Sequence, residues 1–177
     1  ALNEGLIKPE TEFLDLPKSI QCGKNRIGEY DDKIPSDLTA EQIIIRSGNI
    51  GSVRIGQKIG SEKYKSFLEK IGVLSPIDFD INEVAPQKDY NFGKCKLATA
   101  SYGHGIATTI LQLAKGYAIL SNGGYDVKPT LIYKDNENSK GVRLLNSGVS
   151  DQVVTVLRKI VNTEEGTAKF ANVPNYE

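Results

Sequence analysis

The sequence has few of the residues on which metal and nucleic-acid sites usually depend. It contains a single histidine, His104, and two cysteines, Cys22 and Cys95, and these show no metal-ligand spacing. Lys plus Arg and Asp plus Glu number 22 each, so the formal net charge is zero and no basic field indicates a nucleic-acid partner. We therefore expect no metal, no cofactor and no nucleic acid.

Long apolar runs are also missing. The longest uninterrupted aliphatic run is Ile43-Ile44-Ile45, which is far too short to span a membrane, and residues 1–4 do not resemble a signal peptide. These first residues instead predict the last turn of a helix closed by Gly5, and 173–177 is typical of the approach to a strand. We expect one folding unit over 1–177, cut from a longer protein.

The apolar spacing predicts a mostly helical chain with small β hairpins. Capping boxes at Thr39 with Gln42 and at Thr109 with Gln112 open two of the helices, and Ser150 is the expected cap of the last one. The expected helices cover 39–47, 50–60, 61–71, 109–121 and 151–162. The expected strands cover 19–22, 26–28, 130–133 and 141–145, and a turn over 135–140 joins the last two strands. Residues 73–96 are expected to be irregular and 98–105 to form a small-residue turn.

The segment Ser47-Gly48-Asn49 lies where one apolar helical pattern stops and the next begins. A hydroxyl and a carboxamide at such a junction can face a cleft while the apolar flanks hold them rigid. Ser, Gly and Asn are also the usual residues of a helix C-cap followed by an N-cap. The tripeptide alone therefore leaves a catalytic and a purely structural interpretation open.

Two other features have both a chemical and a structural interpretation. His104 between two glycines could act in acid–base chemistry, but no carboxylate or cysteine lies near it in sequence, so we expect it to brace a loop. Cys22 belongs to the expected hairpin and Cys95 to the irregular segment. These need not be close, and we expect free thiols.

Three segments together resemble the transpeptidase domain of class B penicillin-binding proteins, most closely the division-specific group. The first is 46–52, which contains the Ser-x-Asn triplet. The second is 98–105, continuing through 111–114 to 121–124 and 128–129. The third is weaker and resembles the approach to a Lys-Thr-Gly motif: 165–168, followed by 171–176. Their order and spacing hold over nearly the whole chain. Gly48 departs from relatives, in which the middle residue is more often Ser or Asp, and we expect it to loosen the local geometry.

The resemblance implies peptidoglycan D,D-transpeptidation through a serine ester, with penicillin as a substrate mimic. Ser47 would relay a proton between the base and the leaving amine, and Asn49 would hydrogen-bond the substrate's acyl amide and brace the lysine. The nucleophile of Ser-x-x-Lys and the Lys-Thr-Gly motif do not occur in this sequence. The resemblance places them before Ala1 and after Glu177, so the chain should be the helical lobe of an α+β transpeptidase fold and inactive alone.

The same resemblance implies peptidoglycan stem peptides, β-lactams and division-machinery proteins as partners of the full-length protein, at the periplasmic face of the inner membrane. The alternatives are a non-catalytic helical binding module, or a relative of the β-lactam sensors and β-lactamases. If the sheet is missing, the helix over 151–162 would expose a stripe that drives self-association. Its members are Val153, Leu157, Ile160 and Val161.

Overall fold

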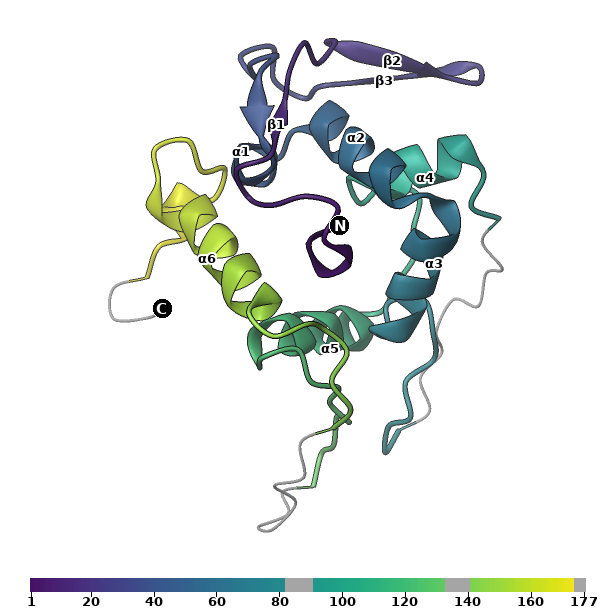
Figure 1. The fold of residues 1–177 in the computed structure, drawn as a ribbon. Helices are drawn as coiled ribbons and strands as arrows, with labels where there is room; N and C mark the ends of the chain where they lie inside the picture. The colour runs from purple at the N-terminus through teal and green to yellow at the C-terminus, as the bar shows by residue number, and fades with distance from the viewer. Residues whose placement is uncertain (82–90, 133–140, 174–177) are drawn as a thin grey trace.

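Helices arranged in a ring dominate the computed structural model, which describes residues 1–81, 91–132 and 141–173. Figure 1 shows the ring surrounding a short 3-10 helix, η1 (Leu2–Glu4), at the N-terminus. Its members are α1 (Ala40–Ile45), α2 (Asn49–Ile59), α3 (Ser61–Lys70), α5 (Ile110–Ser121) and α6 (Val149–Asn162), and α4 (Lys94–Ala100) packs against α2 and α3. The C-terminal described segment holds a second 3-10 helix, η2 (Lys169–Ala171).

The strands form two small antiparallel pairs. β1 (Glu12–Phe13) pairs with β4 (Leu38–Thr39), and β2 (Ser19–Cys22) forms a hairpin with β3 (Asn25–Gly28). The hairpin lies across the start of α2 at one end of the ring (Figure 1). The expected fold class, mostly α with small β elements, is confirmed.

The starts of α1 and α5 were predicted correctly from their capping boxes. The Thr39 hydroxyl accepts from the Gln42 amide at 3.2 Å while the Gln42 side chain accepts from the Thr39 amide at 3.0 Å. Thr109 and Gln112 form the same reciprocal pair at 3.1 and 2.8 Å. Each box satisfies two orphan amides of a first turn with residues only three apart.

Two glycines let α2 approach its neighbours closely. A Cβ at Gly51 would lie 2.5 Å from the Ile43 side chain, and one at Gly56 would lie 1.9 Å from Ser101 Oγ. Gly51 lies against α1 and Gly56 against α4, so both contacts need the absence of a side chain. The two glycines lower the helix propensity of α2 and in return allow this close packing.

Two expectations for segments without strong signals were wrong. Lys94–Ala100 is helical, although no side chain caps it, because Leu97, Ala98 and Ala100 are buried in the packed core. Residues 130–132 form no strand, and Leu131 and Ile132 are exposed. Residues 142–145 bond instead to the chain leaving α5, through the Tyr125–Arg143 bridge and the Gly124 carbonyl. Tyr133 and the turn over 135–140 lie outside the described residues.

The expectation of free thiols was also wrong. Cys22 and Cys95 form a disulfide, with their Cα atoms 5.4 Å apart. The hairpin and α4 meet because both pack on α2, and this long-range approach leaves no trace in the local pattern around either cysteine. The bond joins residues separated by 73 positions and ties the hairpin to α4.

The last helix differs from its prediction in two ways. It starts at Val149 after Gly148, and Ser150 does not cap it; the buried Ser150 hydroxyl donates to the Leu120 carbonyl and accepts from the Gly123 amide. The stripe predicted to be exposed is half-buried instead, because α6 packs along α1 and α5. No helix among residues 1–81, 91–132 and 141–173 is long and apolar enough to cross a bilayer.

Candidate functional site

The junction between α1 and α2 is a helix C-cap with an unusual residue in its key position. The Gly48 amide donates to the Ile43 carbonyl at 2.8 Å and the Ser47 amide donates to the Ile44 carbonyl at 3.1 Å. This pair of bonds is the Schellman motif, whose left-handed residue is usually glycine. Here the residue is Ser47, with φ of 54°, although glycine is next to it at position 48. A non-glycine residue in this region costs roughly 1–2 kcal/mol.

Gly48 does not need to be glycine. Its φ of −67° and ψ of 118° are accessible to any residue, and a Cβ there would make only ordinary contacts of 3.7 Å or more. The expected loosening of the geometry by Gly48 therefore has no counterpart in its backbone conformation. The strained position of the triplet is occupied by its serine.

A carboxylate from a distant segment caps the start of α2. Glu29 accepts from the Asn49 amide through Oε2 at 2.7 Å and from the Ile50 amide through Oε1 at 3.0 Å. Gly48, at the N-cap position, has no side chain to do so. An anion at a helix N-terminus satisfies orphan amides and is favoured by the helix dipole.

The side chains of the triplet are available for chemistry to different degrees. Ser47 is exposed, and its hydroxyl forms no hydrogen bond with any residue in the described part of the chain. Asn49 is half-buried; its Nδ2 donates to the Gly28 carbonyl at 2.9 Å, and its Oδ1 accepts no hydrogen bond from a described residue. No described base contacts Ser47, so its hydroxyl is a candidate for proton relay and not for an activated nucleophile.

The segment of residues 165–167 lies beside the same turn. Arg46, the residue before Ser47, pairs with Glu165 at 3.0 Å between Nε and Oε2. The Thr167 amide donates to the Ile45 carbonyl at 3.4 Å. The fold thus brings the first and third of the motif-bearing segments together across 119 residues of sequence. Residues 174–176 of the third segment lie outside the described residues.

The segment of residues 98–105 contacts α2 through Ser101, which lies beside Gly56, and α3 through Ala100. The Tyr64 hydroxyl donates to the Ala100 carbonyl at 3.0 Å, and burial raises the pKa of the Tyr64 phenol, which keeps it a neutral donor. His104 is exposed and stacks on Tyr102, with ring centroids 6.1 Å apart. The bracing role expected of His104 stays a prediction.

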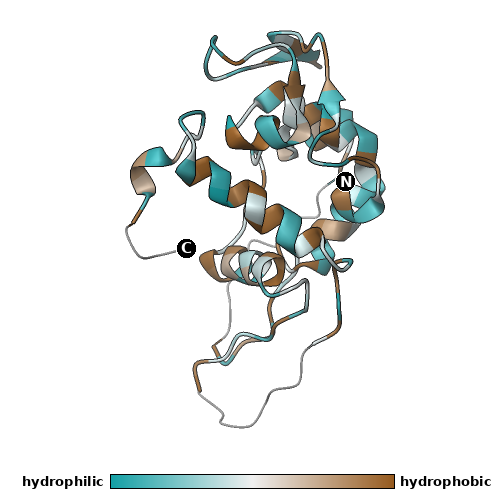
Figure 2. Ribbon diagram, turned by 60° about the vertical axis from the view of Figure 1, so that its left-hand side comes forward, coloured by the Kyte–Doolittle hydropathy of each residue, from teal (hydrophilic) through white to brown (hydrophobic). Residues whose placement is uncertain are grey.

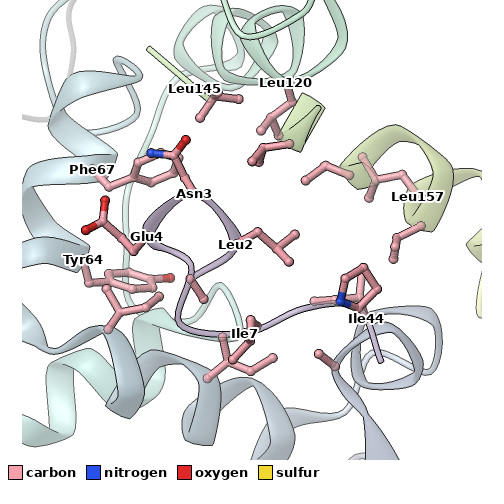
Figure 3. A pocket seen from close by; sticks show the side chains of 18 of the residues that line it. Leu2, Asn3, Glu4, Ile7, Ile44, Tyr64, Phe67, Leu120, Leu145 and Leu157 are labelled. Atoms are coloured by element: carbon pink, nitrogen blue, oxygen red, sulfur yellow. The ribbon is translucent and has the colours of Figure 1, made fainter. Parts of the chain in front are cut away.

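An apolar cavity of about 390 Å³ lies inside the ring of helices. It is lined by residues from η1 and all the ring helices, and Figure 3 shows Leu2 of η1 between Phe67 of α3 on one side and Leu157 of α6 on the other. In Figure 2, brown hydrophobic positions alternate with teal hydrophilic ones along α6. Among the described residues no group of three or more His, Cys, Asp and Glu side chains could hold a metal ion.

Sequence reasoning missed Glu29 and Tyr30. The Tyr30 hydroxyl donates to the Arg46 carbonyl at 3.0 Å, so both residues hold the junction from just beyond the hairpin. Neither lies in a motif, and the only signal was a carboxylate following a predicted hairpin. Because their partners lie 16 to 21 positions away, only the fold reveals their role.

A family model described as penicillin binding protein transpeptidase domain matches residues 1–177. The chain is 30% identical to a peptidoglycan D,D-transpeptidase FtsI homolog of Mesostigma viride, over 83% of this chain and 24% of that protein. It is 26% identical to a probable peptidoglycan D,D-transpeptidase FtsI of Caulobacter vibrioides, over 98% of this chain and 30% of that protein. The chain therefore spans less than a third of the length of these relatives.

Solved structures show the same fold. The transpeptidase domain of Burkholderia pseudomallei penicillin-binding protein 3 superimposes with a TM-score of 0.84 over 99% of this chain and 53% of that chain, at 24% identity. The resemblance carried by the three segments is thus matched by independent comparisons over the whole sequence. The chain belongs to the penicillin-binding protein transpeptidase domain family.

Proposed function

We propose that this chain is the helical part of a peptidoglycan D,D-transpeptidase that cross-links stem peptides through a serine acyl-enzyme and is acylated by β-lactams. The observation that carries the proposal is Ser47, held in a left-handed conformation with an unengaged hydroxyl. Strain at a residue whose side chain forms no structural bond is typical of a functional site. Membership of the transpeptidase family gives the reaction class.

Ser47 and Asn49 have separate roles in this reaction. The nucleophilic serine outside this chain attacks the acyl carbonyl, and the bond from that carbon to the leaving nitrogen breaks. Ser47 passes the proton taken from the nucleophile to the leaving nitrogen, and Asn49 hydrogen-bonds the acyl amide of the substrate and braces the lysine base. A positioned proton relay of this kind contributes about 10²–10⁴ in rate.

We propose that the segment before Ala1 brings the nucleophile into the ring. Support comes from the apolar cavity around η1, whose walls would bury an apolar helix leading into Leu2–Glu4. The self-association expected of this chain alone belongs to the same proposal, and exposed apolar side chains such as Ile110 and Phe170 support it. Light scattering of the isolated chain tests that expectation, and a strictly monomeric chain at high concentration contradicts it.

The cellular setting is proposed from the relatives. Two of them are named for FtsI, which supports septal peptidoglycan as the substrate and division-machinery proteins as partners. The Cys22–Cys95 disulfide supports exposure to an oxidising compartment such as the periplasm. Anchoring in the inner membrane through a segment before Ala1 belongs to the same proposal.

Labelling with a fluorescent penicillin tests the proposed function in the full-length protein. Ser47→Ala and Asn49→Ala should each lower the acylation rate by about 10²-fold or more, because a proton relay or an amide contact is lost in the transition state. Both variants should stay folded by circular dichroism. Acylation within a few-fold of the parent for both would return Ser47-Gly48-Asn49 to a helix junction within a binding module.

The chain alone should behave differently from the full-length protein. Without Ser-x-x-Lys no ester can form, so penicillin should leave no covalent label on residues 1–177. Intact mass spectrometry after incubation with penicillin measures this. A mass increase located at Ser47 would make Ser47 the nucleophile and overturn the assigned roles.

A further inference from the structure

Three consecutive residues, Gly28, Glu29 and Tyr30, form hydrogen bonds with the chain on both sides of Ser47. Gly28 accepts through its carbonyl from the Asn49 side chain, and Glu29 accepts from the first two amides of α2. The Tyr30 hydroxyl donates to the Arg46 carbonyl. We call residues 28–30 the clamp. It contacts the residues on both sides of Ser47, and its side chains leave the Ser47 hydroxyl free.

The clamp also supplies what the junction lacks. Gly48 offers no capping side chain, and the strain of Ser47 favours relaxation of the turn. Glu29 binds the two amides with both carboxylate oxygens, which fixes the direction in which α2 starts. The Asn49 Nδ2 donates to the Gly28 carbonyl. The carboxamide is thereby oriented so that its Oδ1 is the atom that can accept a further hydrogen bond.

From this arrangement we propose that Glu29 is a positioning residue of the transpeptidation reaction, acting through Asn49 and the Ser47 turn. This inference rests on the proposed function, and it adds a residue from outside the motifs. Both carboxylate oxygens of Glu29 accept from backbone amides, so its proposed role is indirect. Glu29 holds the helix start that sets where the carboxamide and the hydroxyl lie. Displacement of a reacting group by about 1 Å can cost about 10²-fold in rate.

Glu29→Gln is the sharpest substitution because it preserves size. One oxygen becomes an NH2 that faces a backbone N–H, so one amide of the α2 start loses its acceptor. The rate of acylation by fluorescent penicillin is measured on the full-length protein, at a temperature well below its melting temperature. This rate should fall about tenfold to a hundredfold. Glu29→Asp keeps two acceptor oxygens and should recover part of this loss.

Thr109→Ala is the matched control. It also removes a cap from a helix N-terminus, that of α5, and so lowers stability by a comparable mechanism. Its acylation rate should remain within about twofold of the parent. An equal loss in Thr109→Ala would show that acylation follows general stability, which overturns the positioning role.

A double-variant cycle separates positioning from other effects. Because Glu29 acts partly through Asn49, Glu29→Gln should lower the rate less in the Asn49→Ala background than in the parent. Full additivity of the two losses overturns the proposal. If Ser47→Ala and Asn49→Ala themselves leave acylation unchanged, the proposed function fails instead, and the two failures are distinguishable.

Tyr30→Phe provides a second variant should Glu29→Gln not fold. It removes only the exposed hydroxyl that donates to the Arg46 carbonyl. The expected loss in acylation is about threefold to tenfold, because one of the contacts that fix the turn is removed. An unchanged acylation rate in Tyr30→Phe overturns the proposed positioning role of the clamp. This holds whether or not the Glu29→Gln protein folds.

Discussion

The starts of α5 and α2 solve the same physical problem in opposite ways. Both leave backbone amides without intrahelical partners. At α5, Thr109 and Gln112 satisfy them locally, three residues apart. At α2 the acceptor is Glu29, which lies 20 residues from Asn49, while the neighbouring Ser47 is held in the left-handed region. With this remote cap, the Ser47 hydroxyl and the Asn49 Oδ1 form no hydrogen bond with a described residue.

The largest expected difference between the two helix starts comes from the disulfide. Loss of Cys22–Cys95, in a Cys22→Ser and Cys95→Ser variant, should lower the free energy of unfolding by about 4 kcal/mol from loop entropy. Because the bond anchors the hairpin that ends at Gly28, the α2 start should loosen more than the α5 start. Hydrogen exchange should therefore accelerate at Asn49 and Ile50 more than at Gln112. Equal acceleration at all three amides would contradict the remote support of α2.

Removing the local cap should produce a smaller effect confined to α5. Thr109→Ala should lower the free energy of unfolding by about 1 kcal/mol, measured by urea denaturation. Exchange of the Gln112 amide should accelerate while that of Asn49 stays unchanged. A loss of protection at Asn49 would show that the two helix starts are coupled.

Relieving the strain at the junction should act in the opposite direction. Ser47→Gly places the residue best suited to φ of 54° in the left-handed position, so stability should rise by about 0.5–1 kcal/mol after the entropy cost of glycine. Penicillin acylation of the full-length protein should still collapse. A variant that is both less stable and fully active would mean that Ser47 is there for structure.

The smallest effect is expected at the middle of the triplet. Gly48→Ser should change stability by no more than about 0.5 kcal/mol, since its backbone is extended and a Cβ meets nothing closer than 3.7 Å. Urea denaturation measures the stability, and the acylation rate should stay near that of the parent. A loss above about 2 kcal/mol would place the conformational demand of the junction on Gly48 and not on Ser47.

Short-range chemistry made much of the helical fold predictable from the sequence. The capping boxes at Thr39 and Thr109 act over three residues, and the apolar spacing of 61–71 repeats within one helix, so both are visible in a linear pattern. The triplet Ser47-Gly48-Asn49 was identified as a junction for the same reason. The family resemblance of the three segments was confirmed by the transpeptidase family model over residues 1–177.

Long-range packing decided the remainder. The helix Lys94–Ala100 forms because α2 buries one of its faces, and the Cys22–Cys95 bond forms because the hairpin and α4 meet on α2. Glu29 reaches Asn49 only once the chain between them has folded back. The sequence by itself determined which residues are the candidates for the proposed chemistry. The tertiary structure decided which one carries the strain and which distant carboxylate holds it in place, since both depend on contacts between segments that local patterns do not record.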